Sequence, residues 1–196
     1  DSEHLARDNR RIKTLLQDAE LRIPSASLED VDASAARGID KAMLRQFSSG
    51  AWIDQNLNAL ITGATGVGQS YLACALGQNA CRRGLRVLYR RMPRLFDELT
   101  LAKADGTYAK LLRKLARAQL LILDDLGLGS PSDAQRHEVL EDRYGSRATV
   151  VTSQLPRESW HEWLGDPTLA DAILDRLVHN AYKIDLTGPS RRKTKT

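Results

Sequence analysis

The stretch GATGVGQS, residues 63–70, has the residue types and spacing of a phosphate-binding loop. It follows the apolar run 57–62 and opens a helix-length segment, which is where such a loop is expected. Glycines there let successive backbone N–H groups point at an anion, and the helix N-terminus adds its positive dipole end. The pattern G-x-x-x-x-G-K-[ST] has lysine before the hydroxyl residue, whereas this chain has Gln69 before Ser70. A glycine-rich turn without a ligand is the alternative interpretation.

Two adjacent carboxylates, Asp124 and Asp125, end a second apolar run, LLILDD at 120–125. This is a Walker B arrangement, in which the first Asp holds the Mg²⁺ shell and the second orients and deprotonates a water. Acidic residues also end strands without a catalytic role, but both motifs in order favour a P-loop nucleotide fold. Ser70 and Asp124 are thus the predicted Mg²⁺ ligands, and Asp125 is the predicted catalytic carboxylate. The residues predicted to bind ATP in the loop are Gly63, Ala64, Thr65, Gly66, Val67, Gly68, Gln69, Ser70 and Tyr71.

Short apolar runs alternate with helix-length segments from residue 57 onward. The predicted strands span 57–62, 86–90, 120–124, 148–152 and 182–186. The predicted helices are a surface helix before residue 24, one over 68–83, a pair within 93–118 split at Asp105-Gly106, one from Ser132 and one from Asp166. Five buried-type strands separated by helices predict a doubly wound α/β domain, whose five-stranded parallel sheet is covered by helices on both faces.

The composition, 42% hydrophobic and 28% charged, is that of an ordinary soluble domain. No apolar run approaches the roughly 20 residues of a membrane span, which predicts a cytoplasmic protein with no membrane partner. The net charge of +4 is concentrated in residues 191–196, and a second basic stretch covers 82–94. Clustered Arg and Lys are typical of a nucleic-acid partner, although a solvated face gives the same pattern. Cys74 and Cys81 are expected to be buried, reduced thiols.

Five segments resemble the AAA+ ATPase domain of the IstB family, the ATP-binding helpers of insertion-sequence transposases. They are GATGVGQSYLACALG, LLILDDLGL, VVTSQLP, DPTLADAILDRLVHNA and GPSRRK. The likeness covers about residues 20–193, and the family is similar in turn to the helicase loader DnaC and the initiator DnaA. The resemblance implies an ATP- and Mg²⁺-dependent protein that binds double-stranded DNA, forms homo-oligomers on it and directs its cognate transposase to a target.

The same resemblance implies a domain division and roles for further residues. A helical segment 1–23, the remnant of a helical N-terminal region, precedes an AAA+ domain 24–196 that ends in a basic tail, 188–196. Ser153 and Gln154 match the sensor that touches the γ-phosphate, Gln154 as a catalytic residue. Arg176 matches the arginine finger offered to a neighbouring subunit's nucleotide, and Arg192 matches the second sensor arginine. A surface charge for Arg176 and a loose basic tail for Arg192 remain the alternatives.

The helix pair predicted at 93–118 resembles the inserted pair that DnaA-type proteins turn toward DNA. The basic residues expected to contact DNA are Lys103, Lys110, Arg113, Lys114 and Arg117. The last four of them are spaced three, four and seven apart, along one helical face. Such a face could follow phosphates without reading bases, although a solvated amphipathic helix has the same pattern.

Gln69 can donate hydrogen bonds but lacks the lysine charge that assists departure of the terminal phosphoryl group. The missing charge is expected to weaken ATP binding by about tenfold or more, and hydrolysis further. Because Ser70, Asp124, Asp125 and Arg176 are all retained, substitution in an active ATPase is favoured over gradual decay of the site. The alternative functions are a DnaC-like helicase loader, a small-molecule P-loop kinase and a DNA-binding scaffold that uses no nucleotide.

Overall fold

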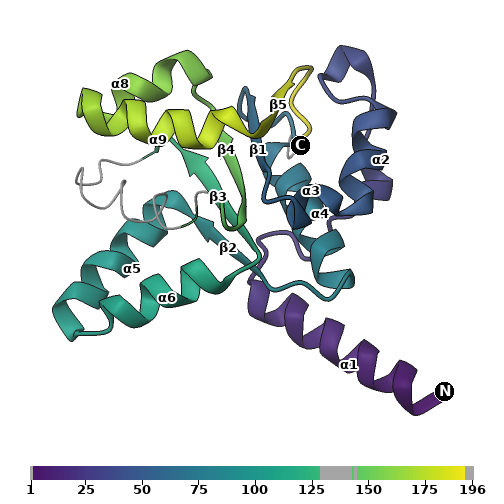
Figure 1. The fold of residues 1–196 in the computed structure, drawn as a ribbon. Helices are drawn as coiled ribbons and strands as arrows, with labels where there is room; N and C mark the ends of the chain where they lie inside the picture. The colour runs from purple at the N-terminus through teal and green to yellow at the C-terminus, as the bar shows by residue number, and fades with distance from the viewer. Residues whose placement is uncertain (1, 129–142, 144, 193–196) are drawn as a thin grey trace.

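A computed structural model describes residues 2–128, 143 and 145–192, which are built around a five-stranded parallel sheet (Figure 1). The strands are β1 (Asn58–Gly63), β2 (Val87–Arg91), β3 (Leu120–Leu126), β4 (Ala148–Ser153) and β5 (Ala181–Leu186). Their order across the sheet is β2-β3-β4-β1-β5, and every neighbouring pair is parallel. The predicted doubly wound α/β fold is therefore confirmed.

The two faces of the sheet carry separate hydrophobic cores, because successive strand residues point to opposite sides. Ala59 and Ile61 of β1 face one core, and Leu60 between them faces the other. The first core is covered by the end of α1 (Ser2–Ala19) and by α2 (Lys41–Ser49), α3 (Ala51–Asp54) and α4 (Gln69–Arg82). The second is covered by α5 (Met92–Asp105), α6 (Tyr108–Arg117), α8 (Trp160–Leu164) and α9 (Pro167–His179).

Most predicted elements lie within two residues of their observed bounds. Gly106 ends α5 in the left-handed conformation at φ 80°, which explains the predicted break in the helix pair. The strand predicted at 120–124 continues to Leu126, so that both carboxylates belong to β3. Helices α2, α3 and α8 were not predicted, and the helix predicted from Ser132 lies outside the described residues.

The end of the N-terminal helix α1 packs into the core on one face of the sheet. Ala19 and Leu21 are buried in the same core as Ala26, so this core extends across the proposed boundary at residue 23. Cys74 and Cys81 are free and buried, as expected. No helix in the described part of the chain is long and apolar enough to cross a bilayer.

Candidate functional site

The loop between β1 and α4 lies at the carboxyl edge of the sheet, where parallel strands all end. Gly66 and Gly68 adopt left-handed conformations, with φ of 87° and 109°. An L side chain is strained there, and a Cβ on Gly66 would also collide with the Ser190 hydroxyl. The two glycines therefore let the loop curl tightly before α4 begins at Gln69.

Ser70 and Asp124 meet directly, although strand β4 lies between β1 and β3 in the sheet. The Ser70 hydroxyl donates to the two Asp124 carboxylate oxygens at 2.9 and 3.0 Å. Asp124 is fully buried and also accepts hydrogen bonds from the Tyr89 hydroxyl, at 2.5 Å, and from Thr152 Oγ1. Burial and the bond to Asp124 raise the pKa of Tyr89, so it stays a donor. The hydroxyls hold the carboxylate in one position.

Asp125 sits at an irregular point of β3. Its φ is 64°, and the β3–β4 register shifts between Leu123 and Leu126. Its N–H donates to Thr152 Oγ1 at 3.0 Å, while its carboxylate accepts from Arg91 Nε at 2.6 Å. This hydrogen bond raises the pKa of Arg91, which remains a cation. The backbone turn brings the second carboxylate to the pocket wall rather than to the next position of a regular strand.

Gln69 ties the loop to the sheet instead of extending away from it. Its Nε2 donates to the Gly63 carbonyl at 2.5 Å and to the Ser153 carbonyl at 2.8 Å. The residue is buried, with only 7% of its surface exposed to solvent. An amide nitrogen has two hydrogens, so both are used on backbone carbonyls of β1 and β4 in this arrangement.

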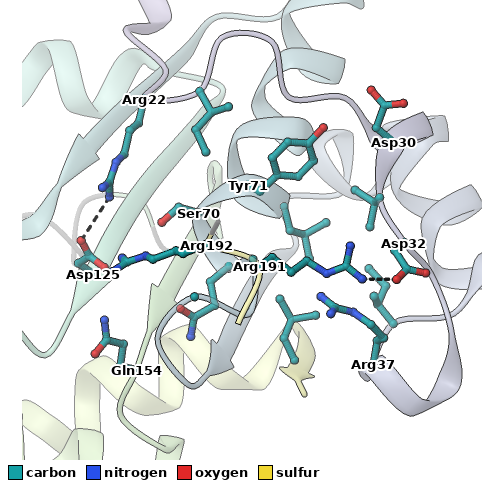
Figure 2. A pocket seen from close by; sticks show the side chains of 18 residues that line it. Arg22, Asp30, Asp32, Arg37, Ser70, Tyr71, Asp125, Gln154, Arg191 and Arg192 are labelled. Atoms are coloured by element: carbon teal, nitrogen blue, oxygen red, sulfur yellow. Dashed lines mark hydrogen bonds and ion pairs between the residues drawn. The ribbon is translucent and has the colours of Figure 1, made fainter. Parts of the chain in front are cut away.

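A pocket of about 520 Å³ opens beside the loop, within the range of small-molecule sites (Figure 2). Gln69, Ser70 and Asp125 line it, together with apolar side chains from Val31, Ile39 and other residues. Four arginines also line it: Arg22, Arg37, Arg191 and Arg192. This combination of an apolar wall with arginines and a glycine-rich loop suits a flat aromatic ring that carries phosphates.

The arginines come from segments remote in sequence. Arg37 Nη2 donates to the Val67 carbonyl at 2.7 Å, while its Nε and Nη1 are buried with no hydrogen-bond partner among the described residues. Arg191 pairs with Asp32, and its N–H donates to the Gly66 carbonyl at 2.8 Å. Arg22 lies 3.8 Å from Asp124 and 3.9 Å from Asp125. Sequence reasoning missed Arg22, Arg37 and Arg191 as site residues, because isolated arginines in loops carry no motif.

A family model described as IstB-like ATP binding protein matches residues 1–196. The chain belongs to this family. It is 54% identical over 190 residues to y4pL of Sinorhizobium fredii (strain NBRC 101917 / NGR234), which is named an insertion sequence ATP-binding protein. The match covers 95% of this chain and 77% of that protein.

Two solved structures support the fold of this IstB-like chain. DnaI superposes with a TM-score of 0.69 at 27% identity, over 92% of this chain and 93% of its own. The DnaC helicase loader gives a TM-score of 0.66 at 21% identity, over 83% of this chain and 97% of its own. The chain is therefore an ATP-binding member of the P-loop AAA+ class, as the sequence motifs predicted.

The remaining loop and sensor residues occupy different positions around the IstB-like pocket. Gly66, Gly68, Tyr71, Gln154 and Arg192 line it. Figure 2 shows Arg192 pointing toward the end of the pocket that holds Asp125. Gly63, Ala64, Thr65 and Val67 do not line the pocket.

Ser153 lies behind the pocket wall. Its hydroxyl donates to the Leu126 carbonyl at 2.6 Å and accepts from the Leu155 N–H at 3.1 Å. In this arrangement the Ser153 hydroxyl holds the ends of β3 and β4. Of the two residues expected to act as the sensor, only Gln154 lines the pocket.

Arg176 and the predicted DNA contacts lie away from the pocket. Arg176 belongs to α9 and does not line it. Lys110, Arg113, Lys114 and Arg117 line a second hollow, a groove of about 1210 Å³ between α1, β2 and the α5–α6 pair. Lys103 does not line this groove, and its Nζ lies 4.7 Å from the centre of the Tyr108 ring.

Proposed function

We propose that this chain binds ATP with Mg²⁺ in the pocket beside the Gly63–Ser70 loop and uses it to control assembly on DNA. The contact between Ser70, which lines a pocket with four arginines, and the buried Asp124 behind it carries the proposal. A hydroxyl and a carboxylate suit Mg²⁺, which binds through few protein oxygens and takes the rest from phosphates and water. In the described part of the chain, no group of three His, Cys, Asp or Glu could hold a metal alone. Mg²⁺ bound here would neutralise phosphate charge.

The biological role that we propose is assistance to a transposase. Membership of the IstB-like family and the 54% identity to an insertion sequence ATP-binding protein support it. In this proposal the chain forms homo-oligomers on double-stranded DNA and directs its cognate transposase to a target. Arg176, outside its own pocket, serves the nucleotide of a neighbouring subunit, and the α6 lysines and arginines follow DNA phosphates.

Gln69 makes this chain a poor ATPase in our proposal. Its amide brings no charge to the terminal phosphates, and both of its hydrogens are used on backbone carbonyls. Asp125, which would orient the attacking water, is held by Arg91 at 2.6 Å. ATP binding through the loop's N–H groups persists, whereas transfer of the terminal phosphoryl group to water slows.

The second candidate function is loading of a replicative helicase. The DnaC loader shares this fold, and DnaI is 27% identical over 92% of the chain. Capture experiments with the cognate transposase and with the replicative helicase distinguish the two. Binding to the helicase alone would favour the loader.

The deciding experiment is ATP hydrolysis with and without double-stranded DNA, for this chain and for Gln69→Lys, with light scattering of the DNA-bound complexes. We expect little turnover from the native chain and DNA-stimulated turnover from Gln69→Lys. A native turnover rate typical of active ATPases would contradict the impairment. Monomers on DNA at every nucleotide concentration would contradict the assembly role.

A further inference from the structure

Arg22 lies at the acidic end of the pocket, although it comes from the segment that follows α1. Its Nη1 is 3.8 Å from Asp124 Oδ2 and 3.9 Å from Asp125 Oδ2. Figure 2 shows the side chain reaching from the upper wall toward Asp125, while Arg192 reaches toward the same end from the loop side. The guanidinium thus lies beside the predicted Mg²⁺ ligands.

Arg22 is held less firmly than Arg37, Arg91 and Arg191. Arg191 is paired with Asp32, Arg37 donates to the Val67 carbonyl, and Arg91 donates to Asp125 at 2.6 Å. The two Arg22 distances are longer than a hydrogen bond, and its side chain is 47% exposed. Its charged group can therefore turn toward a ligand without breaking a short bond to Asp124 or Asp125.

The backbone on both sides of Arg22 is anchored. Leu21 and Ala26 are buried in the core, and the Ala26 N–H donates to the Ile23 carbonyl at 3.1 Å. The Arg22 side chain consequently starts from a defined point above the loop. Little backbone entropy is lost when its guanidinium binds.

Nucleotide phosphates would add negative charge at this end, where Arg91 is already bonded to Asp125. Asp124, Asp125 and nucleotide phosphates are all negative. Gln69 is neutral, and its side-chain amide already donates to two backbone carbonyls. We propose that Arg22 supplies to the terminal phosphates of the bound nucleotide the positive charge that Gln69 lacks. The proposal rests on the proposed function, namely that this pocket binds ATP.

The first test compares Arg22→Met with Arg11→Met by calorimetric titration of the full chain with ATP and with ADP, in Mg²⁺. Arg11 is a matched control because it is an exposed arginine like Arg22 but does not line the pocket. Its guanidinium donates to the Gly84 carbonyl at 3.3 Å. Arg22→Met is expected to weaken ATP binding by about tenfold and ADP binding less. Arg11→Met is expected to bind both as the native chain does.

The second test places Arg22→Met in a Gln69→Lys background, which completes a double-mutant cycle. If Arg22 replaces the missing lysine charge, its removal should weaken ATP binding by no more than about threefold once lysine is present. Equal losses in both backgrounds would overturn the proposal, since the two positions would then act independently.

Whether Arg22→Met weakens or strengthens ATP binding distinguishes this proposal from other roles of Arg22. If Arg22 only neutralises Asp124 and Asp125 and competes with Mg²⁺, Arg22→Met should strengthen Mg²⁺-dependent ATP binding, which overturns the proposal. If Arg22→Met lowers the melting temperature of the nucleotide-free chain, Arg22→Lys, which keeps the positive charge, is compared with Arg22→Gln, which does not. A loss of ATP affinity as large in Arg22→Lys as in Arg22→Gln overturns the proposal. If the native chain binds no ATP, the proposed function itself is refuted. If the native chain binds ATP and Arg22→Met binds it equally well, only the Arg22 proposal is overturned.

Discussion

The nucleotide pocket and the α6 groove are both rich in basic residues, but they are built differently. The pocket draws its arginines from segments near residues 22, 37 and 191, and they surround one loop. The groove takes most of its basic residues from the single helix α6, beside apolar residues such as Leu15 and Val87. The pocket's charges converge on a point, whereas those of the groove are spread along a line.

This difference indicates what each surface can bind. Converging donors around a glycine-rich loop suit a compact anion whose oxygens are reached from several sides. Charges repeated along a helix suit an extended polyanion, whose attraction depends on salt more than on sequence. A positively charged stretch in a sequence therefore does not by itself say which kind of phosphate it meets.

The largest expected effect comes from breaking the support of the groove. Arg143 is buried, and its guanidinium donates to the carbonyls of Leu115, Ala118 and Ala148 at 2.6, 2.9 and 2.7 Å. Arg143→Met removes these three buried hydrogen bonds and should lower the free energy of unfolding by about 3 kcal/mol or more. Urea unfolding measures this, with exposed Arg147→Met as the control. Equal midpoints for the two variants would contradict the assignment.

A smaller loss is expected from the acidic end of the pocket. Asp124→Asn removes the carboxylate proposed to hold Mg²⁺ and should weaken ATP binding in Mg²⁺ by about tenfold or more. In EDTA the loss should disappear or reverse, because a negative charge near the phosphates has gone. Titration with each buffer measures this, and exposed Asp97→Asn should match the native chain in both. The same loss in EDTA would mean that Asp124 acts only as a structural acceptor.

Removing the basic residues along α6 should weaken DNA binding and leave ATP binding unchanged. Changing Lys110, Arg113, Lys114 and Arg117 together to Gln should reduce the slope of log affinity against log salt by about 0.9 for each phosphate that the variant no longer neutralises. Fluorescence anisotropy with duplex DNA at several salt concentrations measures the slope, and Lys41→Gln with Arg45→Gln on α2 is the control. An unchanged slope would leave the groove without a DNA role.

The smallest effect is expected at the two cysteines. Burial raises the pKa of Cys74 to about 11 and that of Cys81 to about 12, so both thiols should resist alkylation at pH 8 until the chain unfolds. Unfolded thiols ionise from about pH 8.5, so the folded state holds more protons above that pH, and the free energy of unfolding should fall as pH rises toward 11. Labelling followed by mass spectrometry tests the first statement. Rapid labelling of the folded chain would contradict it.

The sequence by itself determined the loop, the strands and their parallel arrangement, because residue periodicity and glycine placement act over short distances. It also related Ser70 to Asp124, since Ser70 follows one strand, Asp124 lies near the end of another, and the carboxyl ends of both strands share one edge of the sheet. Only the tertiary structure decided which loop arginines reach the pocket, and that Gln69 is tied to β1 and β4. Those contacts depend on strand order and on how distant loops pack, and no local pattern encodes them.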